Sequence, residues 1–125
     1  MKLSLRHIIY FRVLFCITLV AVTYLATTEL EFTAVSSSYD KLNHFSAFLV
    51  LALLLDFSFP NSRFNTDKIL PLIAYGVGIE VIQHYLPHRM FSFFDVGADI
   101  LGLVGYGLLI PFLRRIPLFE DRWIK

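Results

Sequence analysis

The sequence predicts an all-α protein, an integral membrane bundle of four helices, on the basis of three observations. Hydrophobic residues make up 57% of the chain and charged residues 17%, whereas an ordinary soluble domain carries roughly 25% charged residues. The apolar residues gather in four segments, each close to the roughly 20 residues that cross a bilayer core as a helix. A length of 125 residues leaves room for one domain, so we expect residues 1–125 to form a single unit.

The first predicted span covers residues 8–26 and contains one charge, Arg12. A basic start followed by an apolar run is also typical of a cleaved signal peptide. However, "TYLATT" is a poor small-x-small cleavage site and three more apolar segments follow. We therefore expect a retained helix, in which the long side chain of Arg12 reaches the headgroups.

Three further spans follow, at residues 43–59, 69–86 and 96–113. The second lies between "SSSYDK" and "PNSRFN", and the proline, asparagine and serine of the latter favour a turn. Pro87 ends the third span, and two arginines follow the fourth.

Lysine and arginine residues predict the orientation, because short cytoplasmic loops carry the excess of them. They concentrate in the N-terminal tail, in the loop between the second and third spans, and in the C-terminal tail, while the other two loops hold only Lys41 and Arg89. Both termini are therefore expected in the cytoplasm. The net charge of +1 gives no electrostatic argument for a nucleic-acid partner, so membrane lipids are the expected surroundings.

Polar residues on three of the predicted helices share a depth in the membrane. Residues three or four apart share a helix face, and a charge at the centre of a span costs roughly 2.5–3.5 kcal/mol, so the polar faces should meet one another. Small residues, Ala98, Gly102 and Gly105, would let the fourth helix approach its neighbours closely. The stripes are Asp40, His44, Ala47 and Leu51 on the second span, Gly76, Glu80, Gln83 and His84 on the third, and Asp95, Asp99, Gly102 and Tyr106 on the fourth.

Some of these residues also have plainer interpretations. Asp40 and Asp95 are each suited to cap the N-terminus of a helix. Asp56 and Asp67 lie near the cytoplasmic end and are expected at the membrane interface, and His88 is expected in an exposed loop. Glu80 has no surface role of this kind, because it lies about a turn inside a span.

Two stretches, "DKLNHFSAF" and "EVIQHYLPHRMFSFFDVGADILG", resemble the VanZ-like family of small bacterial membrane proteins. The family pattern is Asp-Lys-x-x-His at the start of a helix, Glu-x-x-Gln later, a Pro-Gly-Arg turn, then an aspartate, an asparagine and a glycine. His88 stands where glycine is usual and Asp99 where asparagine is common. The pattern extends over residues 40–107 and falls on Asp40, Lys41, His44, Glu80, Gln83, Pro87, Arg89, Asp95 and Gly102.

The resemblance implies a four-helix protein of the bacterial cytoplasmic membrane. The family is named for a member associated with resistance to the glycopeptide teicoplanin, and it implies no settled molecular activity. An outward-facing polar cluster agrees with a role in the cell envelope, because glycopeptides act outside the cytoplasmic membrane.

The favoured function is recognition of an anionic lipid or a cell-envelope precursor headgroup in an outward-facing pocket. Lys41, His44 and Arg89 would supply donors for phosphate or carboxylate, and the acidic residues would orient these donors or contact sugar and amine groups. The predicted binding residues are Asp40, Lys41, His44, Glu80, Gln83, Arg89, Asp95 and Asp99.

Three alternatives use the same residues. A membrane enzyme acting on a lipid-linked phosphate would use Glu80, His44 or Asp95 as catalytic groups, although no serine or cysteine nucleophile signature accompanies them. A purely structural network would pair the carboxylates with Arg89 and the histidines. A metal site from His44, Glu80, His84 and Asp99 is disfavoured because there is no His-Glu-x-x-His run, and no cofactor is expected.

Overall fold

Four helices make up most of the chain that the computed structural model describes, which comprises residues 4–27, 37–60, 62–86 and 93–116, without the side chains of residues 37–41. They are α1 (Leu5–Thr27), α2 (Ser37–Ser58), α3 (Thr66–His84) and α4 (Phe93–Leu113). The described ranges contain no strand. The prediction of an all-α chain with four helices is therefore confirmed.

Each helix starts earlier than the apolar segment that predicted it. The first turn of α2 is Ser-Ser-Tyr-Asp, and α3 starts at Thr66 behind Asn65, whose side chain accepts a hydrogen bond from the Asp67 backbone N–H at 3.2 Å. Polar residues are favoured at helix N-termini because they satisfy the first N–H groups, and hydropathy overlooks them. Asp40 and Asp95 consequently lie within first turns and are not the cap residues considered from the sequence.

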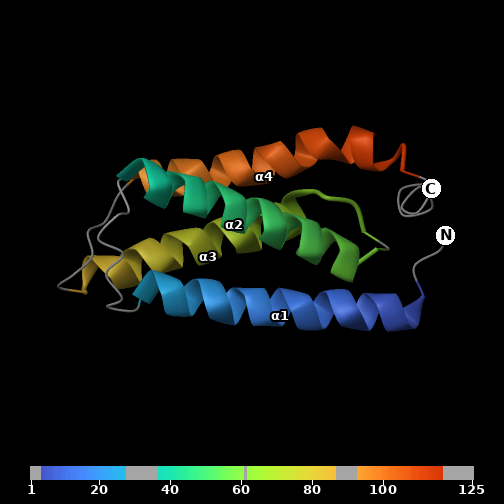
Figure 1. Cartoon of the computed structure of the whole chain (residues 1–125), viewed down its shortest axis with the longest axis horizontal. Coiled ribbons are helices and arrows are strands. Elements are labelled where there is room, and N and C mark those ends of the chain that lie inside the picture. Colours follow the sequence, from blue (N-terminus) through green and yellow to red (C-terminus); the bar gives the residue numbers. More distant parts are fainter. Residues whose placement is uncertain (1–3, 28–36, 61, 87–92, 117–125) are drawn as a thin grey trace.

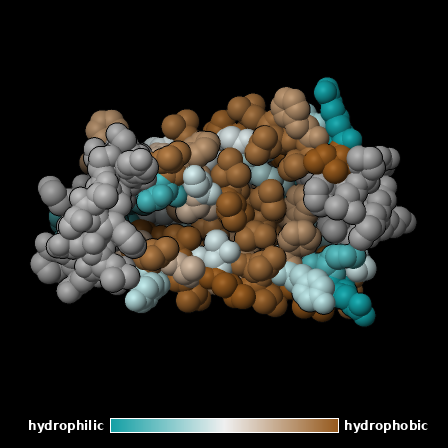
Figure 2. Space-filling model, in the orientation of Figure 1, coloured by the Kyte–Doolittle hydropathy of each residue, from teal (hydrophilic) through white to brown (hydrophobic). Residues whose placement is uncertain are grey.

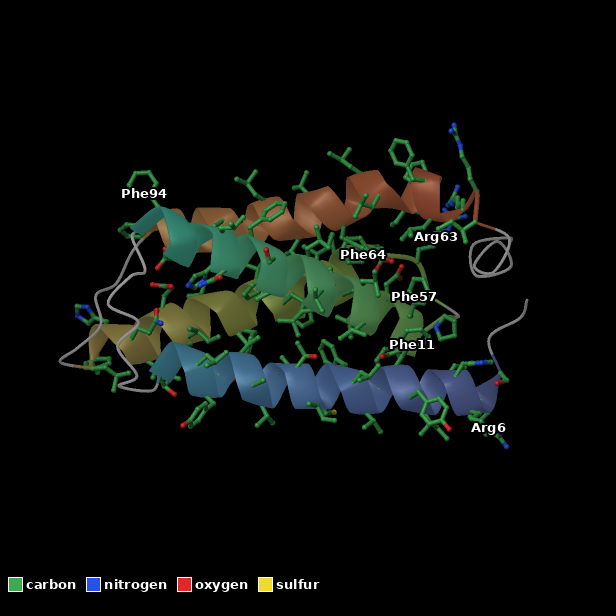
Figure 3. All side chains as sticks on the ribbon, in the orientation of Figure 1. Arg6, Phe11, Phe57, Arg63, Phe64 and Phe94 are labelled. Atoms are coloured by element: carbon green, nitrogen blue, oxygen red, sulfur yellow. The ribbon has the colours of Figure 1, made fainter. Side chains whose placement is uncertain are left out.

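The helices run up and down along the long axis of the molecule, with α2 and α3 between α1 and α4 (Figure 1). The start of α1 and the end of α4 lie at the same end, which we call the Arg6 end, and the start of α4 marks the opposite Phe94 end (Figure 3). The most extensive helix contact joins α2 to α4. The start of α2, the end of α3 and the start of α4 therefore meet at the Phe94 end.

The core is formed mainly by α2 and α4. Its buried side chains are Phe48, Leu51, Ala52, Leu72, Leu103 and Tyr106. No residue of α1 is buried, although Phe11 packs edge-on against Phe57 of α2 with ring centroids 5.1 Å apart (Figure 3). Helix α1 thus packs on the outside of α2 and α3, on the side of the bundle opposite α4.

Large apolar side chains cover the outside of the helices. On the face drawn in Figure 2, apolar surface fills the middle of the molecule, and the hydrophilic residues lie mainly towards its two ends. Among the described helices, α1 and α4 are long and apolar enough to cross a membrane, while the apolar part of α2, Leu42–Ser58, is shorter. Length and composition thus identify two helices that could cross a membrane, compared with the four spans expected from the sequence.

Candidate functional site

Four ionisable side chains from three helices meet at the Phe94 end. His44 of α2 lies between Glu80 of α3 and the two aspartates of α4. Its Nδ1 is 2.7 Å from Asp99 Oδ1, while its Nε2 is 3.9 Å from Glu80 Oε1 and 3.8 Å from Asp95 Oδ2. The sequence prediction that the polar stripes of three helices converge is therefore correct for these four residues, which we call the His44 cluster.

The cluster is deeply buried on its acidic side. Glu80 is 0% exposed, Asp99 2% and Asp95 4%, whereas the His44 side chain is 12% exposed. Burying a carboxylate away from water is costly unless charge or hydrogen bonding compensates for it. His44 is thus the most exposed member of the cluster, and the three carboxylates are buried behind it.

Glycine residues allow the helices to approach closely around the cluster. A Cβ at Gly76 would lie 2.6 Å from Asp99 Oδ2, so only glycine leaves room for this carboxylate beside α3. A Cβ at Gly102 would lie 2.5 Å from the carbonyl oxygen of Phe45, which is the residue next to His44. The proposed packing role of Gly102 is therefore confirmed, and Gly76 has a similar role at the α3–α4 contact.

Two other residues of the predicted stripe on α3 point elsewhere. Gln83 is buried, but its Nε2 donates to the Ala26 carbonyl oxygen at 2.8 Å and so links α3 to the end of α1. His84 is exposed, and its ring packs edge-on against Tyr85 with centroids 5.4 Å apart. The metal site that combined His44 with His84 is therefore wrong, because the two histidines lie on different surfaces.

Three predicted site residues lie outside the described side chains. Asp40 and Lys41 fall in the first turns of α2, and Asp40 precedes His44 by four residues, the spacing of one helix face. Arg89 falls in the segment 87–92 between α3 and α4, which the description does not include. Their part in the site stays a prediction.

The geometry of His44 determines what the cluster can do chemically. An ionised Asp99 accepts a hydrogen bond, so the short contact favours the tautomer whose proton is on Nδ1. Nε2 then presents its lone pair towards Glu80 and Asp95, at distances too long for direct hydrogen bonds. A histidine oriented in this way can accept a proton or coordinate a cation at Nε2.

A second buried polar cluster, at the Arg6 end, was not predicted. Lys68 Nζ is 2.6 Å from Asp56 Oδ1 and also donates to the carbonyl oxygens of Phe59 and Ser62, at 3.0 and 2.9 Å. Tyr106 donates its hydroxyl to Asp56 Oδ2 at 2.5 Å. Asp56 is completely buried, so the expectation of an interface residue is wrong for it.

Arg12 contributes to the same end of the bundle. Its Nε donates to the Ser58 carbonyl oxygen at 3.0 Å, and its guanidinium lies over the Phe59 ring, 4.7 Å from the centroid. This arginine therefore joins α1 to the end of α2 instead of only reaching towards headgroups. The hydrogen bonds of Lys68 and Arg12 close the connection between α2 and α3, which is a structural role.

The fold and the His44 cluster define a small helical protein with a buried, carboxylate-rich polar site at one end. No protein-family model and no solved structure match the chain. A curated relative is the uncharacterized protein C11E3.10 of Schizosaccharomyces pombe, which is 35% identical over 66 residues. The match covers 50% of this chain and 41% of the yeast protein. The chain thus spans less than half of this relative, whose name gives no activity, and the resemblance to the VanZ-like family remains a prediction.

Proposed function

We propose that the chain is a VanZ-like integral membrane protein that recognises a lipid or lipid-linked precursor headgroup at the His44 cluster. The observation that carries this proposal is the convergence of four ionisable side chains from three helices at one end of an apolar bundle. Such residues are expensive inside a membrane and usually mark a functional site there. A headgroup would reach the cluster from the side of His44, whose side chain is its most exposed member.

All four helices would cross the membrane in this proposal, with the His44 cluster in its outer half. The lysines and arginines among the described side chains support that orientation, since they lie towards the Arg6 end, the end that the positive-inside rule assigns to the cytoplasm. They are Arg6, Arg12, Arg63, Lys68, Arg114 and Arg115. The apolar surface between the two ends supports it as well (Figure 2).

The orientation can be tested by labelling single cysteines with a membrane-impermeant maleimide. In a Cys16→Ala background, Phe94→Cys should react on intact cells and Arg63→Cys only after permeabilisation. Both positions are exposed and lie at opposite ends of the bundle (Figure 3). The reverse pattern would place the His44 cluster in the cytoplasm, and equal labelling of both positions on intact cells would contradict a membrane-spanning bundle.

The headgroup that fits best carries both a phosphate and an amine or sugar hydroxyls. Lys41 and Arg89 would bind the phosphate, since a guanidinium can donate to two phosphate oxygens at once. The carboxylates of the cluster would accept hydrogen bonds from the amine or hydroxyl groups. A site that combines these carboxylates with Lys41 and Arg89 would bind a zwitterionic or sugar-bearing headgroup better than a simple anion.

Native mass spectrometry of the protein, purified from its own membrane in a mild detergent, tests this recognition. A lipid or precursor should copurify with the wild-type protein and with Arg63→Ala, but be lost from Arg89→Ala at an unchanged melting temperature. Arg63 is the matched control, because it is an exposed arginine at the opposite end. Equal retention of the ligand by both variants, or unfolding of Arg89→Ala alone, would contradict recognition and favour a structural network.

The Asp99–His44 contact favours hydrolysis of a lipid-linked phosphate as a second candidate. When a carboxylate holds the Nδ1 proton of a histidine, Nε2 is the ring nitrogen that accepts a proton from a water molecule, as in other general-base pairs. Asp99→Asn and Glu80→Gln should then abolish phosphate release, measured per molecule of lipid that each variant still binds. If these variants release phosphate at the same rate as the wild type, hydrolysis at the His44 cluster is excluded.

A further inference from the structure

Three atoms that could coordinate a metal converge in the His44 cluster. They are His44 Nε2, Glu80 Oε1 and Asp95 Oδ2, one from each of α2, α3 and α4. Glu80, Asp95 and His44 each offer a ligand atom within 4.8 Å of the other two. The metal site considered from the sequence used His44, Glu80, His84 and Asp99, whereas the ligand atoms that converge in the structure belong to His44, Glu80 and Asp95.

The fourth member of the cluster orients the histidine for coordination. A metal-bound histidine nearly always donates its other ring N–H to a carboxylate, a carbonyl or water, which fixes the ring and makes the coordinating nitrogen more basic. Asp99 is in this position, with Oδ1 2.7 Å from His44 Nδ1. Because Gly76 has no Cβ, the Asp99 carboxylate fits beside α3 in this position. A carboxylate–histidine pair that aims Nε2 at two further carboxylates is thus a metal site with its supporting shell.

The spacing of the three atoms suits an ion with short bonds. Two ligands each about 2.1 Å from an ion at a tetrahedral angle lie about 3.4 Å apart. The observed separations of 3.9 and 3.8 Å from Nε2 are about 0.4–0.5 Å longer, which a small rotation of the carboxylate side chains would remove. One imidazole nitrogen and two carboxylate oxygens suit Zn²⁺ or Mn²⁺, whereas Mg²⁺ prefers oxygen ligands alone.

We infer that the His44 cluster is a binding site for a divalent transition-metal ion of the Zn²⁺ type, held by His44 Nε2, Glu80 and Asp95 and supported by Asp99. Three protein ligands leave one coordination position for another ligand, as in zinc sites that bind an exogenous ligand. A phosphate oxygen is a suitable group for that position. The metal site itself rests on the geometry of the cluster and does not depend on headgroup recognition.

Metal content and metal affinity of the full chain test this inference. The protein, purified in detergent without chelator, should contain about one Zn²⁺ or Mn²⁺ per chain by elemental mass spectrometry. After treatment with a chelator, titration with ZnCl₂ should restore one equivalent and raise the melting temperature, whereas MgCl₂ at the same concentration should not. A wild-type protein that carries no metal and shows no Zn²⁺-dependent melting temperature overturns the proposal.

Variants of the cluster locate the ion. Glu80→Gln and Asp95→Asn should each remove stoichiometric Zn²⁺ binding, and Asp99→Asn, which changes only the support of His44, should weaken it by about 10–100-fold. His84→Asn is the matched control, because this exposed histidine lies one helical turn from Glu80 and should leave the affinity unchanged. Unchanged Zn²⁺ affinity in Glu80→Gln, or loss of binding in His84→Asn, overturns the assignment.

The variant Arg89→Gln distinguishes a bound metal ion from a positive charge that the protein itself supplies. If the guanidinium of Arg89 were the positive charge of the cluster, the wild-type protein would bind no Zn²⁺ and Arg89→Gln would gain a site, an outcome that overturns the proposal. Zn²⁺ binding by the wild type that persists in Arg89→Gln supports it. Headgroup binding is measured by the copurified lipid and metal binding by Zn²⁺ titration. A failure of the headgroup proposal can therefore be distinguished from a failure of the metal-site proposal.

Discussion

The α2–α4 contact should be very sensitive to a single methyl group at Gly102. In Gly102→Ala, the new Cβ would lie 2.5 Å from the Phe45 carbonyl oxygen and 3.0 Å from the Leu49 backbone nitrogen. Both atoms belong to the backbone of α2 and are not the ends of flexible side chains. The substitution can therefore be accommodated only if the two helices separate or one of them bends.

The size of the effect follows from the separation required. An ordinary contact at this Cβ needs at least 3.4 Å, so the helices must move apart by up to about 0.9 Å. A gap of 0.5–1 Å forfeits a quarter to a half of the roughly 0.1–0.2 kcal/mol that each atom pair contributes. Forty pairs, about the number made by one buried leucine, then give a loss of about 1–4 kcal/mol. This range agrees with the roughly 1–3 kcal/mol usual for overpacked cores.

The measurement is thermal or denaturant unfolding of Gly102→Ala in detergent, with Gly107→Ala as the matched control. Gly107 lies on the same helix, and a Cβ there meets nothing within 4 Å. The free energy of unfolding of Gly107→Ala should equal that of the wild type or exceed it by up to about 1 kcal/mol, because alanine is a better helix former than glycine. If Gly102→Ala proved as stable as Gly107→Ala, the close approach of α2 to α4 would be refuted, and with it the geometry that brings His44 to Asp99.

Two further substitutions test contacts elsewhere in the bundle. Lys68→Met should lower the free energy of unfolding by about 3–5 kcal/mol, because it leaves the buried Asp56 carboxylate without the ammonium beside it. Arg63→Met, an exposed loss of the same charge, should change it by less than about 0.5 kcal/mol, and a similar value for both variants would contradict the buried pair. Tyr75→Phe should cost about 0.5–1.5 kcal/mol because it removes the hydroxyl that bonds α3 to α1. The exposed Tyr85→Phe should be neutral in the same unfolding assay, and equal losses in the two tyrosine variants would argue against that link.

The helices and the His44 cluster could be predicted because both depend on periodicity within single segments. Apolar runs located all four helices, and the three- and four-residue spacing placed His44, Glu80, Asp95 and Asp99 on faces that the structure brings together. The cost of burying polar groups singly explains why those faces meet, since each side chain then has polar partners. The same spacing gave the wrong direction for His84, because a stripe defined by i, i+3 and i+4 is wider than the face that α3 buries.

The cluster at the Arg6 end could not be predicted in the same way. Asp56 and Lys68 lie near the ends of two helices, where charged residues are usually solvated, and their contact depends on the path of the connecting segment. One signal was present in the sequence. Tyr106 continues the polar stripe of α4 to the opposite end, and a buried tyrosine hydroxyl requires a partner. That partner is Asp56.

The two buried clusters differ in the charge of their described side chains and in their exposure. At the Arg6 end, one lysine and one aspartate balance in charge, and Lys68 also donates to two carbonyl oxygens of the connection that it closes. At the Phe94 end, the described side chains bring three carboxylates to one histidine, and that histidine is partly open to the outside. The described side chains of this cluster thus carry an excess of negative charge. A positive group that joins the cluster would balance this charge. It could be a metal ion, the amine of a headgroup or a basic side chain of the chain itself. Zn²⁺ titration of the wild type and of Arg89→Gln separates these three sources.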